Sequence, residues 1–246
     1  MKRVKLVVAY DGTAYHGWQI QPETVTVESV LNRAICELTG EEVQVIGASR
    51  TDAGVHALGN VAVFDTDSKI PPEKFSFALN QRLPEDVIIQ SSEEVSADFH
   101  PRHHNCRKTY EYTILNRKFA LPEYRHTAYF YYGLLDVEKM QMAADAFVGE
   151  HDFAAFCSAG AQVKSTVRKI YSLQVIRESE DLIKIRVQGN GFLYNMVRII
   201  AGTLIQVGQG QLEVSNIPDI ISSCDRGQAG PTAPAQGLKL MEIAYE

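Results

Sequence analysis

The sequence has few cysteines, and no two of them lie close together. The four are Cys36, Cys106, Cys157 and Cys224, and no CxxC pair occurs. This spacing argues against a zinc ribbon and against a scaffold of disulfides, so we expect a protein with reduced thiols. Long apolar runs are also lacking, since none approaches the roughly 18 residues that span a bilayer. The first residues enter a strand pattern without a cleavage site, so we expect no signal peptide and a cytoplasmic protein.

Several catalytic motifs are missing as well. The sequence contains no HExxH, GxSxG or Walker motif, which excludes the common zinc protease, α/β-hydrolase and P-loop classes. The turn Gly189-Asn190-Gly191 does not complete a GxGxxG phosphate loop, because Tyr194 occupies the last position. We therefore expect no metal, nucleotide or redox cofactor.

The formal net charge is 24 − 30 = −6, which on its own argues against a nucleic-acid partner. The distribution of charge gives a different indication. Residues 98–118 carry five Lys or Arg against two acids, and residues 164–198 carry seven against three. The acids gather elsewhere, with five against one base in residues 136–152. These counts are compatible with one basic face, although surface charges also segregate without function.

Hydrophobic periodicity predicts an α+β protein made of two similar halves. The first half shows strands at 2–10, 43–48, 60–66 and 87–94, a helix at 27–38 and a second helix from 72, in the order β-α-β-β-α-β. This is the ferredoxin-like split unit. Thr26 is the expected N-cap of the first helix, and Gly40 follows its end.

The second half repeats this order with one extra helix. Strands are expected at 107–116, 166–177, 181–189 and 238–245, helices at 137–147, 192–207 and 213–223, and a loop near 153–164. We expect domains at 1–104, with the catalytic loop, and at 105–246. The two halves are expected to share one extended mixed or antiparallel sheet with a central cleft.

The stretch SRTDAGVH, residues 49–56, follows a strand pattern and carries unusual polar residues. Asp52 and Gly54 suit a simple turn, in which the carboxylate accepts a backbone N–H. Arg50 and His56 are not needed for a turn. On local sequence alone Asp52 is either a turn former or an ionised catalytic carboxylate at a strand end.

Two further residues are candidates for a site. In the strand RKTYEYTI (107–114), Tyr110 shares a face with Lys108 and Tyr112, where an aromatic ring beside cations can stack a base. An ordinary core tyrosine fits this pattern equally well. Arg198 lies in an apolar helix, where an arginine usually has an acidic partner or extends to solvent.

The segment FHPRHHNC (99–106) contains three histidines and a cysteine. A zinc site is one interpretation, but the histidines His103 and His104 are adjacent and no paired-ligand spacing is repeated. A polar connector that touches phosphates or solvent fits the spacing better.

Taken together, these motifs resemble the tRNA pseudouridine synthase A family. The resemblance is carried by SRTDAGVH, by VAYDGTAYHGWQ (8–19), FHPR (99–102) and RKTYEY (107–112), and by GNGFLYNMVRIIAGTL (189–204) and GPTAPAQGL (230–238). They follow the order and spacing of the family over nearly the whole chain. The family usually has glycine where Ser49 stands, so here a Cβ is added beside the loop and the reactive groups are unchanged.

The resemblance implies the pseudouridine synthase fold and isomerisation of uridine to pseudouridine at positions 38, 39 and 40 of the tRNA anticodon stem-loop, without a cofactor. It assigns catalysis to Asp52 and base stacking to Tyr110. Arg50 would enter the stem and help to hold the target nucleotide out, and Arg198 would pair with Asp52. It further implies a homodimer with tRNA as partner and no membrane association.

Three alternatives remain at this stage. A related pseudouridine synthase with another RNA target would carry the same motifs. A non-catalytic RNA-binding protein of the same fold is disfavoured by the intact loop around Asp52 together with Tyr110. A metal-dependent hydrolase would have to use the cluster between His100 and Cys106.

Overall fold

The computed structural model describes residues 1–160 and 163–246 of the chain. It divides into two compact units, each of which mixes helices with a β-sheet. The first unit contains Met1–Asn105 and Leu240–Glu246, and the second contains Cys106–Lys239. The α+β class predicted from the sequence is confirmed. The last seven residues, which the sequence analysis assigned to the second half, group with the first unit.

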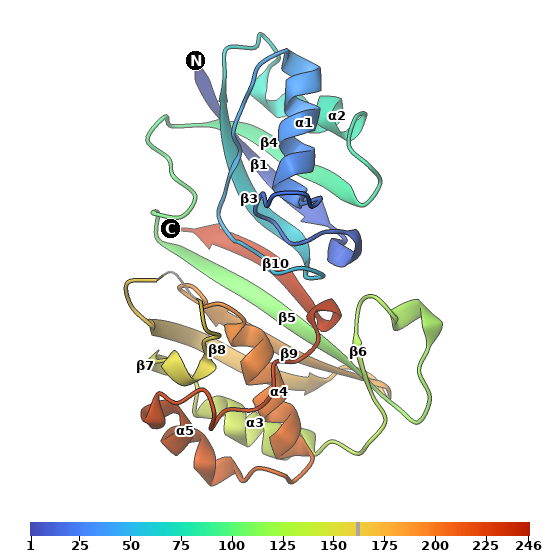
Figure 1. Cartoon of the computed structure of the whole chain (residues 1–246), viewed down its shortest axis with the longest axis vertical. Helices are drawn as coiled ribbons and strands as arrows, with labels where there is room; N and C mark the ends of the chain where they lie inside the picture. Colours follow the sequence, from blue (N-terminus) through green and yellow to red (C-terminus); the bar gives the residue numbers. More distant parts are fainter. Residues whose placement is uncertain (161–162) are drawn as a thin grey trace. The chain divides into compact units, whose positions relative to one another are not determined.

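The first unit follows the predicted order of strands and helices. Its elements are β1 (Lys2–Tyr10), α1 (Val27–Thr39), β2 (Ile46–Gly47), β3 (His56–Thr66), α2 (Phe75–Asn80) and β4 (Val87–Val95). Helices α1 and α2 lie on the same face of the strands (Figure 1). Two 3₁₀ turns, at Gly12–Ala14 and Pro72–Lys74, precede the helices.

Helix α1 begins and ends where its capping residues predict. The Thr26 side chain accepts a hydrogen bond from the Ser29 N–H, and the Ser29 hydroxyl accepts one from the Thr26 N–H, which forms a capping box. Gly40 ends the helix at φ 74°, a left-handed conformation that glycine adopts without strain. The buried side of the helix includes Leu31 and Ile35, which face the core of this unit.

The strands of the first unit have the order β4–β1–β3–β10, where β10 is Leu238–Tyr245. The short strand β2 pairs with β3 in antiparallel orientation. Strand β1 is antiparallel to both β3 and β4. Its pairing with β3 shifts register between Val8 and Tyr10, which marks a β-bulge. Bulges of this kind redirect side chains near the end of a strand.

The second unit contains the predicted hairpin and helices and two short strands that the sequence pattern did not indicate. Its elements are β5 (Cys106–Asn116), β6 (Tyr129–Tyr131), α3 (Val137–Asp145), β7 (Gly149–Asp152), β8 (Val167–Arg177), β9 (Leu182–Gly189), α4 (Met196–Gly208) and α5 (Ile217–Ser223), followed by the start of β10. The order in its sheet is β5–β9–β8–β7, and β6 pairs in parallel with β5.

The two faces of this sheet differ in chemistry, as the alternation along β5 predicts. Tyr112 and Ile114 lie two positions apart, so they share one face, and both are fully buried. On the other face, Glu111 lies opposite Arg186 on β9 and binds it at 2.7 Å, and it binds Lys184 at 3.1 Å. Burial acts to raise the pKa of Glu111, but the hydrogen bonds from these two cations outweigh it, so its pKa lies below the ordinary value.

Two predicted boundaries differ from the structure for local reasons. The expected strand at 43–48 is reduced to Ile46–Gly47, because the Val45 N–H donates to Asn32 Oδ1 and not to a neighbouring strand. Helix α4 starts at Met196 and not at 192, because Asn195 adopts φ 61° and interrupts the helical backbone. Among the described residues, no helix is long and apolar enough to cross a membrane.

Candidate active site

The loop from Ser49 to Val55 joins β2 to β3 in the first unit. Within it Ser49 and Thr51 are buried, Arg50 is exposed and Asp52 is half-buried. The loop therefore alternates between two buried residues and two charged residues that are at least partly accessible.

Backbone hydrogen bonds fix the middle of this loop. The Trp18 N–H donates to the Thr51 carbonyl at 3.0 Å, and the Val55 N–H donates to the Asp52 carbonyl at 3.1 Å. The second bond is the turn that the Asp-Ala-Gly composition predicts. Asp52 thus takes part in a turn through its backbone, which leaves the role of its side chain to be decided separately.

Two glycines of the segment VAYDGTAYHGWQ allow the chain to pack against this loop. A Cβ at Gly12 would lie 2.0 Å from the Val55 carbonyl oxygen. A Cβ at Gly17 would lie 2.6 Å from the Thr51 carbonyl oxygen, and Gly17 also has φ 87°. These approaches are possible only without a side chain. The glycines of this motif therefore support the loop sterically.

A second cation accompanies Arg50. The Arg102 Nε donates to the Gly47 carbonyl at 2.7 Å, which ties the FHPR segment to β2. Burial and then the charge of Arg50 lower the pKa of Arg102, while Glu28 acts in the opposite direction. The positive charge of Arg50 therefore acts on Arg102, and an anion such as phosphate would be attracted by both guanidinium groups.

The histidine cluster forms ring contacts. His100 and His103 have ring centroids 4.1 Å apart, and His104 stacks on Phe99 at 4.8 Å. Burial lowers the pKa of His100, and the charges of His103 and Arg102 add to this effect. Among the residues that the structure describes, no group of three or more His, Cys, Asp or Glu side chains is arranged to hold a metal ion.

Tyr110 lies in β5 of the second unit, opposite Val187 of β9. Its side chain is 6% exposed, and its ring meets the ring of Phe192 edge to face at a centroid distance of 5.3 Å. A T-shaped aromatic pair of this kind holds the orientation of both rings. The burial is also that of a core tyrosine, so both interpretations from the sequence remain open.

Arg198 lies in the first turn of helix α4, in the second unit. Its Nε donates to the Ala233 carbonyl at 2.8 Å, and its Nη1 donates to Asn195 Oδ1 at 2.7 Å. The Ala233 N–H returns a hydrogen bond to the Arg198 carbonyl at 3.0 Å. Hydrogen bonds from two different guanidinium nitrogens thereby orient the side chain. The charge of Arg198 also acts on the hydroxyl of Tyr112, whose pKa is raised, mainly by burial.

The structure brings Arg50 and Asp52 together in one loop of the first unit. Tyr110 and Arg198 belong to the second unit, where both are fixed by neighbouring side chains or backbone. Sequence reasoning missed the contribution of Arg102, although the motif FHPR contained it. A lone arginine in a connector does not by its spacing indicate that it lies beside Arg50.

Comparison with known proteins identifies the family. The family model described as tRNA pseudouridine synthase matches residues 6–104 and 143–246. The chain is 54% identical to the tRNA pseudouridine synthase A of Ruminiclostridium cellulolyticum over 245 residues, with all of both chains covered. A solved archaeal box H/ACA Nop10–Cbf5 complex matches 96% of this chain and 55% of its own at 10% identity, with a TM-score of 0.34, too low to carry an argument.

Other relatives agree with this result. The proteins of the same name from Acetivibrio thermocellus and Brevibacillus brevis are 51% and 47% identical, again over the full length of both chains. The resemblance stated from the motifs is therefore confirmed. The chain belongs to the tRNA pseudouridine synthase family, whose members are isomerases.

Proposed function

We propose that this chain converts uridine to pseudouridine at positions 38, 39 and 40 in the anticodon stem-loop of tRNAs, in the cytoplasm where its substrate is found. The observation that carries the proposal is the loop 49–55. Its backbone is held by Trp18 and by close glycine contacts, and it presents one carboxylate, Asp52, beside the exposed Arg50. The full-length relatives named tRNA pseudouridine synthase A support the choice of substrate.

The reaction is a rearrangement without net oxidation or reduction. The bond from N1 of uracil to C1′ of the ribose breaks, the base turns, and a bond from C5 to the same carbon forms. The proton on C5 leaves to solvent, and N1 regains a proton. Because a paired uridine exposes neither C1′ nor C5, the nucleotide must first leave the helix, at a cost of a few kcal/mol.

We assign the catalytic role to the Asp52 carboxylate, which acts on the nucleotide once it has been flipped. A carboxylate in a closed pocket stays ionised only if a cation compensates the loss of water. We assign this role to Arg198. Its guanidinium is already oriented by Asn195 and the Ala233 carbonyl, so it loses little conformational freedom on pairing.

The remaining cations are assigned to the RNA backbone. Arg50 and Arg102 repel each other, so a phosphate bound between them relieves that repulsion. In the second unit, Arg107 lies over the ring of Tyr171 at 4.8 Å, and Lys169 lies over the same ring at 5.8 Å. Such contacts keep long basic side chains extended over a surface. We assign to these side chains the phosphate contacts by which a chain with net charge −6 would bind RNA.

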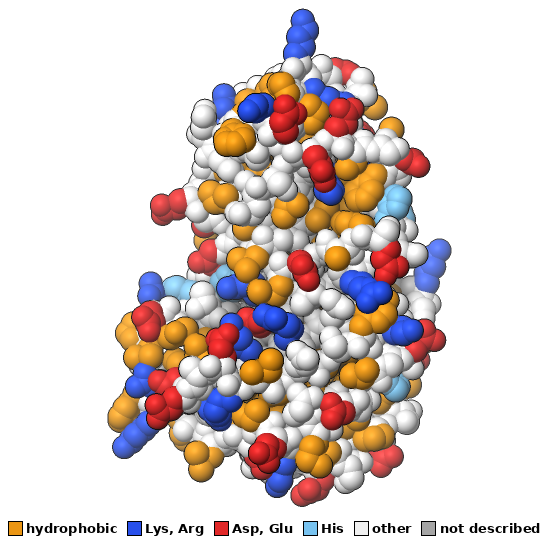
Figure 2. Space-filling view, turned by 180° about the vertical axis from the view of Figure 1, so that it is seen from behind, with side chains coloured by type: hydrophobic (Ala, Val, Ile, Leu, Met, Phe, Trp, Pro, Cys, Tyr) orange, Lys and Arg blue, Asp and Glu red, His pale blue; other side chains and the backbone are white. Residues whose placement is uncertain are grey.

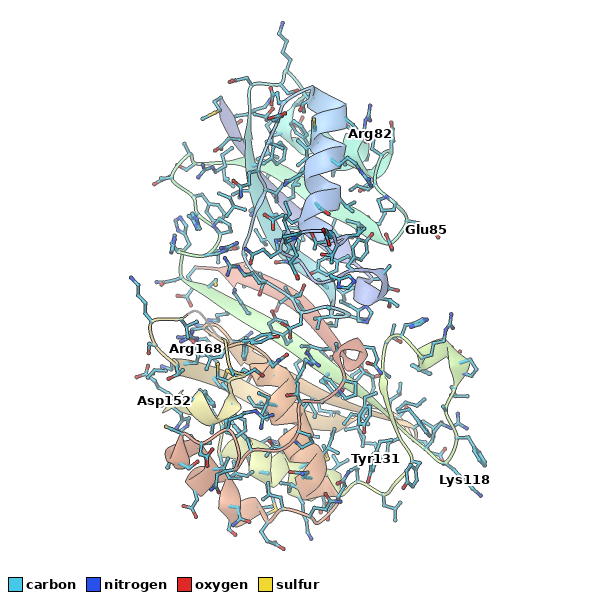
Figure 3. The ribbon with its side chains drawn as sticks, viewed as in Figure 1. Arg82, Glu85, Lys118, Tyr131, Asp152 and Arg168 are labelled. Carbon is cyan, nitrogen blue, oxygen red and sulfur yellow. The ribbon has the colours of Figure 1, made fainter. Side chains whose placement is uncertain are left out.

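We further propose that two copies of the chain form a homodimer through the arm at 117–135, which leaves the body of the second unit. Figure 3 places Lys118 and Tyr131 on this arm, and Figure 2 has orange side chains with Lys and Arg gathered at the edge where the arm lies. Phe119, Tyr132 and Leu134 are 68%, 77% and 95% exposed. Apolar side chains exposed to this extent in one segment are typical of an interface.

Sedimentation of the wild-type chain and of Leu134→Glu tests the dimer. The wild type should be dimeric at micromolar concentration and the variant monomeric. The matched control is Phe77→Glu, because Phe77 is 68% exposed but lies on α2 in the first unit. A wild-type chain that is monomeric and fully active would contradict the proposal.

The substrate is tested with synthetic anticodon stem-loops that carry one uridine at position 38, 39 or 40, and with a stem-loop whose only uridine lies elsewhere. Pseudouridine should form in the first three and not in the fourth. Formation only in another RNA would indicate a synthase with a different target. Binding without conversion of any substrate would favour the non-catalytic alternative.

A further inference from the structure

A buried group of polar side chains lies behind the loop that carries Asp52. The hydroxyl of Tyr10, at the end of β1, and Thr51 Oγ1 share a hydrogen bond of 2.7 Å. Asn60 Nδ2 donates to the Ser49 carbonyl at 3.0 Å and to the Tyr10 hydroxyl at 3.4 Å. All of these residues are less than 8% exposed, and Asn60 is fully buried. The group therefore joins two neighbouring strands to the loop.

The sheet register explains how these side chains come together. Asn60 on β3 lies directly opposite Val8 on β1, so it shares the buried face with Val8 and Tyr10. The bulge between Val8 and Tyr10 shifts Tyr10 to a position opposite Ala57. A polar amide on the apolar face of a sheet is unfavourable unless it is hydrogen-bonded. Here the Asn60 Nδ2 group holds the backbone of the loop, whereas the buried Oδ1 has no hydrogen-bond partner in the described structure.

Thr51 is fixed at two of its atoms by this arrangement. Its hydroxyl is bonded to Tyr10, and its carbonyl accepts from the Trp18 N–H at 3.0 Å. The next residue, Asp52, is bonded through its own carbonyl to the Val55 N–H. The backbone before and after the Asp52 side chain is thus held by hydrogen bonds. This is the arrangement that preorganises a reacting group.

We propose that Tyr10 and Asn60 are positioning residues for catalysis, which hold Thr51 and Ser49 so that the Asp52 carboxylate meets the nucleotide in the reactive geometry. The inference rests on the proposed role of Asp52. A positioning role can be distinguished from a purely structural role, because loss of a positioning contact lowers kcat while leaving binding of the stem-loop unchanged. A structural contact would affect folding stability alone.

Tyr10→Phe tests the proposal with a close control, Tyr15→Phe. Both tyrosines are buried, at 5% and 6% exposure. The Tyr10 hydroxyl bonds to Thr51 of the loop at 2.7 Å, whereas the Tyr15 hydroxyl donates to Asp86, outside the loop, at 2.6 Å. We expect Tyr10→Phe to lower kcat about tenfold with an unchanged dissociation constant. Tyr15→Phe should keep the wild-type kcat, although both variants lose a buried hydrogen bond.

A double variant tests the route of the effect. If Tyr10 acts through the Thr51 hydroxyl, Tyr10→Phe combined with Thr51→Val should lose no more kcat than the larger of the two single losses. Additive losses in kcat would mean that the two residues act independently, and this would overturn the inference. Asn60→Leu, which has a similar shape but no amide, should also lower kcat.

Hydrogen exchange supplies a measurement that does not depend on activity. The amides of residues 50–55 should exchange faster in Tyr10→Phe than in wild type, and at the wild-type rate in Tyr15→Phe. If the wild type proved inactive on all stem-loops, the proposed function would fail, while exchange would still decide whether Tyr10 holds the loop. Equal exchange and equal kcat in Tyr10→Phe and Tyr15→Phe would overturn the inference.

Discussion

Substitution of Gly17 by alanine should damage catalysis as well as stability. The new Cβ would lie 2.6 Å from the Thr51 carbonyl oxygen, and a tolerable contact needs at least 3.0 Å, so the loop must move by 3.0 − 2.6 = 0.4 Å or more. The contact is with backbone that directly precedes Asp52 and cannot rotate away. Since a displacement of about 1 Å can cost a hundredfold in rate, we expect kcat to fall about tenfold.

The stability effect of Gly17→Ala has two parts. A left-handed backbone costs an L-residue about 1–2 kcal/mol, and the overlap adds about 1–3 kcal/mol. Gly40→Ala isolates the first part, because Gly40 has φ 74° and a Cβ there would meet nothing within 4 Å. At about 2–4 °C per kcal/mol, Gly17→Ala should melt several degrees below Gly40→Ala.

The assay for Gly17→Ala is tritium release from tRNA with tritium at C5 of uridine, measured together with thermal unfolding. Gly40→Ala should keep the wild-type kcat at temperatures where it is folded. The reasoning would be refuted if Gly17→Ala unfolded as expected but released tritium as fast as Gly40→Ala. The loop around Asp52 would then tolerate displacement, and its close packing would have no catalytic purpose.

Three further outcomes are expected. Tyr110→Phe should retain turnover better than Tyr110→Ala, because stacking contributes about 1–3 kcal/mol per base; variants with wild-type kcat and KM would make Tyr110 a core residue only. Glu111→Gln should lower the free energy of unfolding at pH 7 by about 1–3 kcal/mol, and pH-dependent unfolding should show this difference disappearing as the pH falls below about 4.5 and through the lowered folded-state pKa. Turnover of a stem-loop that folds without magnesium should persist in chelator; restoration of lost activity by zinc would assign a metal role to His100 and His103.

Much of the fold was predictable because local signals and tertiary packing agree. Helix α1 carries its N-cap Thr26 and its terminal Gly40 in the sequence, and both function as caps in the structure. The hairpin of β8 and β9 was visible from alternation alone. The start of helix α4 was predicted too early. The apolar residues before Asn195 extend the helical pattern, but the backbone of Asn195 is not helical, so the helix begins only after it. Strand β6, with three residues, is too short for a periodic signal.

The site was predictable only in part. Asp52 and Arg50 drew attention because a simple turn does not require both charges. The bond between Tyr10 and Thr51 joins residues 41 positions apart, and no local pattern indicates it. Similarly, the proximity of Arg102 to Arg50 depends on how the FHPR segment returns to Gly47. Contacts between residues so far apart in the sequence depend on the register of the sheet and on its bulge, and the hydrophobic periodicity of the sequence does not resolve either of these.

The most direct test of the central claim is tritium release by Asp52→Asn, compared with its binding of the stem-loop. Asparagine keeps the size of the side chain and removes its charge. The matched control is Asp65→Asn, which removes another carboxylate of the same unit, one paired with Arg3. We predict that Asp52→Asn binds the stem-loop but releases no tritium, while Asp65→Asn releases it normally. Substantial release by folded Asp52→Asn would contradict the assignment of Asp52 as the catalytic group.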